Sequence, residues 1–115
     1  MSCVRIIQGE TTPFLFQLLI PASVETETDF IPYNLTNCSV TFKLIKDDNR
    51  SLTVDASAEI TDAVNGWVKY EWGVGETDIT GMYRAQFNII DTNSKVTILP
   101  KSYIQWIYII EEISG

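Results

Sequence analysis

The 115-residue sequence contains no histidine. This absence excludes Ser-His-Asp and Cys-His catalysis, histidine acid–base steps and most zinc sites. Its two cysteines, Cys3 and Cys38, cannot complete a zinc site alone, and without a secretory signal we expect free thiols. The close glycines Gly73 and Gly75 lack the lysine of a phosphate-binding loop. We therefore expect no catalytic residue, no metal site and no cofactor.

Positive charge and long apolar runs are also scarce. Eight lysines and arginines stand against fifteen acids, a formal net charge of −7 that repels phosphate backbones, so we expect no nucleic-acid partner. The longest apolar run, near Ile107, is far shorter than the ~20 residues of a membrane helix, so we expect no membrane insertion. The length fits one domain spanning residues 1–115.

What the sequence does contain is alternation with a period of two. Tyr83, Ala85, Phe87 and Ile89 share one face of a strand, while polar side chains occupy the other. Turn residues separate similar segments, and no helical pattern is present. The expected strands are residues 4–8, 13–20, 39–46, 57–61, 67–72, 82–90, 95–98 and 103–111. Seven to eight short strands at this spacing predict an all-β antiparallel sandwich.

A glycine and a tyrosine precede the clearest of these strands. In immunoglobulin-like sandwiches a tyrosine near the start of strand F directs its hydroxyl to the upstream backbone and fixes the corner between sheets. Gly81 and Tyr83 fit that corner, and Ala85 stands where antibody domains have their second cysteine. The pattern therefore predicts an immunoglobulin-like sandwich without an inter-sheet disulfide, in which Tyr83 is buried and bonded to backbone.

Four stretches carry a family resemblance that extends over residues 4 to 110: YNLTNCSVTFKL, VDASAEITDAVNGWVKYEW, ETDITGMYRAQFNI and ILPKSYIQW. They resemble the immunoglobulin-like N-terminal domain of phage baseplate upper proteins. The resemblance implies a virion module, assembled in the host cytoplasm, that attaches a receptor-binding device to the tail core. In those proteins further chain follows the domain and holds the receptor-binding protein, whereas this sequence stops at Gly115. The expectation is thus a virion component, with the adaptor role left open.

One long segment, from Pro21 to Asn37, is predicted to be a loop because its strand signals fail. Nothing in its pattern buries it in the domain's own core. We predict that its Asp29, Phe30 and Tyr33 are candidate contacts with a neighbouring virion protein.

The C-terminal strand, Tyr103 to Glu112, is apolar on both faces. A sandwich covers only its inner face, so we expect the other face to meet another copy of this chain or a neighbouring virion component. We assign Ile107 and Ile109 to that outer interface. The alternative is that the end of the long segment folds over this face.

Acidic and aromatic clusters support two competing functions. Neighbouring acids such as Glu71, Glu76 and Asp78 allow a two-carboxylate enzyme, but they read better as solvated loop charges. Acids of the long segment lack the spacing of a calcium loop. The aromatic residues Trp67, Trp72, Trp106, Tyr70, Tyr103 and Tyr108 allow a sugar-binding platform, although core or interface positions fit strands better.

The leading hypothesis is a non-enzymatic structural protein of a tailed-phage virion, a tail or baseplate component or adaptor that docks onto other virion proteins. A capsid decoration or cement protein and a carbohydrate-binding host-adhesion module are the alternatives. Whether the module also forms homo-oligomers stays open at this point.

Overall fold

The computed structural model describes residues 2–23, 26–101 and 104–113. These residues form strands and no helix, which confirms the predicted all-β class. The strands within the described part are β1 (Ser2–Ile7), β2 (Phe14–Gln17), β3 (Leu19–Ser23), β4 (Thr26–Pro32), β5 (Ser39–Lys46), β6 (Leu52–Asp62), β7 (Trp67–Tyr70), β8 (Gly81–Ile90), β9 (Val96–Leu99) and β10 (Gln105–Ile110).

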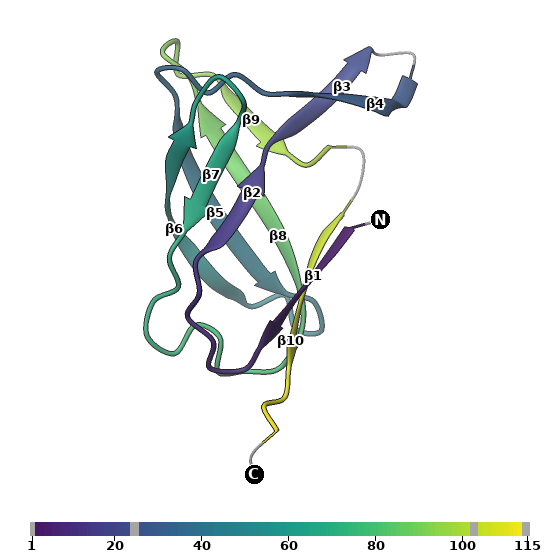
Figure 1. The fold of residues 1–115 in the computed structure, drawn as a ribbon, viewed down its shortest axis with the longest axis vertical. Coiled ribbons are helices and arrows are strands. Elements are labelled where there is room, and N and C mark those ends of the chain that lie inside the picture. The colour runs from purple at the N-terminus through teal and green to yellow at the C-terminus, as the bar shows by residue number, and fades with distance from the viewer. Residues whose placement is uncertain (1, 24–25, 102–103, 114–115) are drawn as a thin grey trace.

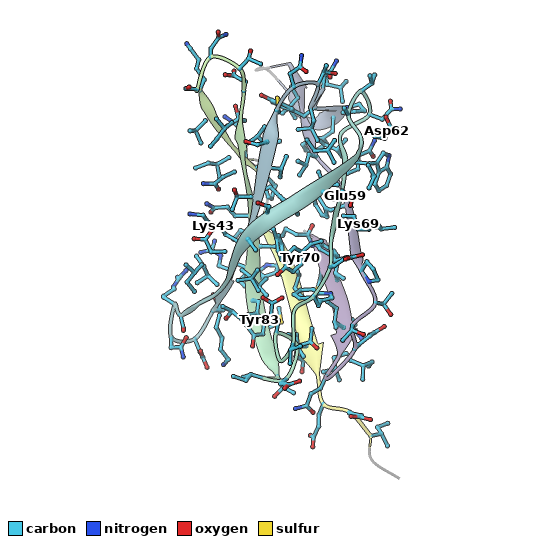
Figure 2. The ribbon with its side chains drawn as sticks, turned by 90° about the vertical axis from the view of Figure 1, so that its left-hand side faces the viewer. Lys43, Glu59, Asp62, Lys69, Tyr70 and Tyr83 are labelled. Atoms are coloured by element: carbon cyan, nitrogen blue, oxygen red, sulfur yellow. The ribbon has the colours of Figure 1, made fainter. Side chains whose placement is uncertain are left out.

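The main sheet runs in the order β1-β10-β8-β5-β6-β7-β2, and it curls into a sandwich-like body (Figure 1). β8 pairs with β5 along one edge, while its other edge is shared by β10 and then β9. β6 pairs first with β5 and then with β7, so it links the two layers. Figure 2 shows β6, marked by Glu59 and Asp62, crossing the near side of the molecule diagonally.

One strand pair departs from the antiparallel prediction. β1 and β10 are parallel, with Val4 beside Ile107 and Ile6 beside Ile109. They lie near opposite ends of the chain, and a parallel pair needs such a long connection rather than a tight turn. The alternation of side chains along each segment indicates that both are strands, but it does not indicate whether the two strands pair in parallel or antiparallel.

Aromatic side chains fill the space between the layers. Phe42 on β5 lies at the centre, with its ring centroid 5.1 Å from that of Phe87 on β8 and 4.8 Å from that of Tyr70 on β7. Phe14 and Trp72 join from the opposite layer, at 5.9 and 6.0 Å from Phe42. Because these rings come from both layers, their burial holds the layers together.

The predicted corner is present at the start of β8. Tyr83 is 1% exposed, and its hydroxyl donates a hydrogen bond of 2.6 Å to the backbone carbonyl of Ile79, which confirms the expected burial and backbone bond. Gly81 has φ +141°, a backbone conformation that disfavours other residues. Both cysteines, Cys3 and Cys38, are free, so the layers are joined without a disulfide, as predicted.

The segment predicted as a loop from Pro21 to Asn37 instead contains most of a hairpin. β3 and β4 form a separate two-stranded sheet, with Ile20 paired to Ile31. Figure 1 shows this hairpin projecting from one end of the body. The loop prediction is wrong here because the hydrogen bonds between β3 and β4 hold a proline-containing sequence that has little strand propensity of its own.

Candidate docking surface

The register of β10 decides which of its two apolar faces points inward. Ile107 lies opposite Tyr83 on β8, and Ile109 lies opposite Gly81. Both isoleucines are 0% exposed and belong to the main hydrophobic core. The prediction that they form an outer interface is therefore wrong. They share the inner face with Tyr83, and the domain itself covers them.

The opposite face of β10 is the one left partly uncovered. Tyr108 is 39% exposed and lies opposite Met82 on β8, which is 37% exposed. On the other side of β10, Ile7 of β1 pairs with Ile110. We call this surface the outer β10 face, and its members are Ile7, Met82, Ile104, Trp106, Tyr108 and Ile110. It joins three neighbouring strands of the main sheet.

Two arginines give this apolar surface a positive character. The guanidinium carbon of Arg84 lies over the Trp106 ring, 5.6 Å from its centroid, a cation–π contact that holds both side chains in place. Arg5 pairs with Tyr108 across the β1–β10 ladder. Alternation along β1, β8 and β10 places no acid on this face, although the chain carries a net charge of −7.

The hairpin residues predicted as contacts lie elsewhere. Tyr33 is half-buried at the hairpin base, where its backbone N–H donates to the carbonyl of Leu18 and its hydroxyl lies 3.4 Å from Thr97 Oγ1. Phe30 is half-buried on β4. The side chain of Asp29 lies outside the described part of the structure. The hairpin itself projects from the end of the body, so β4 lies apart from β10 (Figure 1).

The aromatic residues considered for a sugar-binding platform lie in different surroundings. Tyr70 and Trp72 are buried in the core, at 6% and 8% exposure. Trp67 is 39% exposed on β7, in the opposite layer from Trp106 and Tyr108. Tyr103 lies outside the described residues. Sequence reasoning missed Met82 and Ile7, because they join the surface only through the register of β8 and β1 against β10.

The acids near Tyr70 serve the fold. The Tyr70 hydroxyl donates to Glu76 Oε1 at 2.6 Å, and the backbone N–H of Gly73 donates to the same oxygen at 2.6 Å. Burial, reinforced by the Glu76 carboxylate, holds the pKa of Tyr70 well above its ordinary value. Glu71 instead lies 3.6 Å from Lys69 in a surface ion pair. Figure 2 shows Tyr70 and Tyr83 within the body and Lys69 near Glu59.

Other sites that the sequence raised find no support in the described residues. These residues contain no group of three or more histidine, cysteine, aspartate or glutamate side chains arranged to hold a metal ion. The side chains of Glu25 and Glu27 lie outside the described part. The described chain also has no helix long and apolar enough to cross a membrane.

Comparison with known proteins identifies the family. The model of the BppU N-terminal domain matches residues 22–104, which extend from within β3 to the residue before β10. No curated protein matches the chain. The matched segment contains the Tyr83 corner, β5, β8 and the Phe42 cluster, so it covers the centre of the fold. The chain therefore belongs to the BppU N-terminal domain family, the N-terminal domain of baseplate upper proteins, and is a phage baseplate-associated structural domain.

Proposed function

We propose that this domain is a non-enzymatic docking module of the phage baseplate and that it binds a neighbouring virion protein through the outer β10 face. The observation that carries the proposal is the surface around Trp106 and Tyr108, where aromatic and aliphatic side chains from three adjacent strands remain partly exposed. Aromatic residues and arginine are the side chains most enriched at interface centres.

The described part of the chain leaves this surface partly uncovered. The alternative burial, by the end of the segment from Pro21 to Asn37, would require that segment to lie across β10. Instead, β3 and β4 hydrogen-bond to each other in a separate sheet, and Figure 1 shows them projecting from the body. A second protein is thus the natural cover for the exposed rings.

Charge favours a different protein over a second copy as the occupant. In a two-fold dimer through this face, identical surfaces would meet, and the Arg5 and Arg84 side chains of one copy would approach those of the other. Like charges brought together at an interface cost several kcal/mol. The complementary partner is an apolar surface bordered by carboxylates, on another protein of the baseplate.

Two aromatic substitutions test the proposal. Trp106→Ser together with Tyr108→Ser removes both rings from the outer β10 face, and Trp67→Ser is the control because Trp67 has the same 39% exposure as Tyr108 in the other layer. A phage lacking the gene is complemented with each variant, and the protein recovered in purified particles is measured. We expect at least about a tenfold loss for the double variant, since each anchor contributes on the order of 2 kcal/mol, and normal incorporation of the control.

Two outcomes would contradict the proposal. A folded double variant that enters particles at the native level would remove the outer β10 face from docking. Sedimentation that shows a native dimer, broken by Tyr108→Ser, would replace the neighbouring protein with a second copy of the chain.

A further inference from the structure

A cavity of about 320 Å³ lies where β8 changes its edge partner. Ala85 pairs with Gln105 of β10, whereas Phe87 pairs with Leu99 of β9. Gln86, between them, lines the cavity, and the chain between β9 and β10 contributes Pro100 and Lys101. The volume falls at the lower end of the roughly 300–1,000 Å³ that small ligands occupy. It suits one or two residues of a partner rather than a folded surface.

The cavity concentrates positive charge. Arg50, Arg84 and Lys101, three of the eight basic residues, line it, and no aspartate or glutamate among the described residues does. In the described part of the chain none of these three forms an ion pair, whereas Lys46 and Lys69 both do. A protein with a net charge of −7 thus keeps three unneutralised cations around one opening. Such a site attracts an anion.

Gln105 borders the cavity, but its side chain faces the core. Gln105 is 0% exposed, and its Nε2 donates to the carbonyl of Trp106 at 3.0 Å. Its Oε1 is also buried and accepts no hydrogen bond in the described structure. Gln105 pairs with Ala85 and shares the inner face of β10 with Ile107, whereas Arg84 and Trp106 lie on the outer face. A ligand in the opening therefore does not reach this amide oxygen, and the basic residues alone carry the anion site.

The cation closest to the docking surface is already held in position. The contact between Arg84 and the Trp106 ring fixes the guanidinium, which binds a carboxylate through two parallel hydrogen bonds when its N–H groups are free. Because Trp106 belongs to the outer β10 face, the cavity adjoins the surface that we assign to docking.

We propose that this cavity binds an acidic peptide segment of the neighbouring virion protein. Its side-chain carboxylates pair with Arg84, Arg50 and Lys101. An acidic segment of the docked protein supplies these carboxylates beside the outer β10 face, where Arg84 contacts Trp106. The proposal rests on the proposed docking function, because it names the chemistry of the docked partner.

A charged peptide and its neutral counterpart test the site directly. Capped tetra-aspartate is titrated into the isotope-labelled protein, and the side-chain signals of Arg84 and Trp106 are followed by NMR. We expect saturable shifts of both, and none with capped tetra-asparagine. Arg50→Gln together with Lys101→Gln should weaken the binding about tenfold or more, because charge-assisted hydrogen bonds are lost. Both residues are exposed, so these substitutions leave the core intact.

The control removes two positive charges away from both the cavity and the outer β10 face, through Lys69→Gln together with Lys95→Gln. Equal weakening in this control would overturn the site and indicate general charge attraction. Absence of tetra-aspartate binding would overturn it as well, and tighter binding of poly(glycerol phosphate) would assign the cavity to an anionic polymer instead. If tetra-aspartate fails to bind but Trp106→Ser with Tyr108→Ser blocks incorporation, the docking function stands and only the peptide site is rejected. If tetra-aspartate binds but the double variant is incorporated normally, the peptide site stands and the docking face is rejected.

Discussion

The two faces of β10 have similar composition and different roles. The inner face carries Ile107 and Ile109, which are wholly buried by the domain. The outer face carries Trp106 and Tyr108, and Tyr108 keeps 39% of its surface exposed. The apolar composition therefore indicates that both faces of β10 are covered. It does not indicate whether the domain's own core or another protein covers each face. The pairing of β10 with β8 and β1 makes that distinction, because it aligns one face with Tyr83 and the core.

The largest expected change in the free energy of unfolding comes from truncating a side chain of the inner face. Ile107→Ala should lower the free energy of unfolding by about 2–5 kcal/mol, since it removes a fully buried side chain and leaves a cavity between β10 and the core. Urea unfolding followed by tryptophan fluorescence measures the loss. A loss below about 1 kcal/mol would mean that Ile107 is not a core residue, and the comparison of the two faces would fail.

The next largest loss of stability is expected from the hydrogen bond between Tyr70 and Glu76 at the edge of the core. Tyr70→Phe should cost about 1.5–3 kcal/mol, the range for a hydrogen bond to a charged group, because Glu76 loses the donor that lies 2.6 Å from its Oε1. Lys69→Gln is the neighbouring control on the same strand, where surface ion pairs contribute about 0–1 kcal/mol. Equal losses in the two variants would contradict the assignment.

Tyr70 also makes the stability of the folded protein sensitive to high pH. Burial is the main cause that raises the pKa values of both Tyr70 and Tyr83 in the folded protein. A raised folded pKa contributes stability that is complete below the unfolded value of about 10 and is lost as pH rises above it. Unfolding free energy should therefore fall above about pH 10, less steeply in Tyr70→Phe. An identical slope in the native protein and the variant would show that Tyr70 does not contribute.

A smaller loss is expected at the corner that faces Ile107. Tyr83→Phe keeps the buried ring but removes the hydrogen bond to the carbonyl of Ile79, which should cost about 1 kcal/mol. The midpoint of urea unfolding reports the change, and Tyr108→Phe on the exposed side is the matched control. An unchanged midpoint for Tyr83→Phe would leave the corner without a stabilising role.

Sequence alone predicts the centre of this fold better than its edges. The sequence predicts the strands at residues 39–46 and 82–90 well, because they are long and their apolar and polar side chains alternate between a core face and a more polar face. The parallel β1–β10 pair depends on contacts between the chain ends, and the β3–β4 hairpin depends on pairing rather than propensity. Neither strand pairing produces a local sequence pattern from which it could be predicted.

The same reason explains which parts of the candidate sites were missed. Tyr83 was predictable because its corner is a local motif. Ile107 and Ile109 were placed on the wrong face because β10 is apolar on both sides, and only its register against β8 separates them. The cavity gathers Arg50, Arg84 and Lys101 from three separate segments, so single basic residues in the sequence give no sign that they meet.

The smallest expected effect on stability comes from the outer face, and it completes the comparison. Tyr108→Ser should change the free energy of unfolding by no more than about 0.5 kcal/mol, because the tyrosine lies on the surface and no core side chain loses its cover. The same unfolding experiment on Trp67→Ser, with equal exposure in the opposite layer, sets the scale for an exposed ring. If Tyr108→Ser cost as much as Ile107→Ala, the outer β10 face would be part of the domain's own stability, and its exposed rings would no longer require a partner.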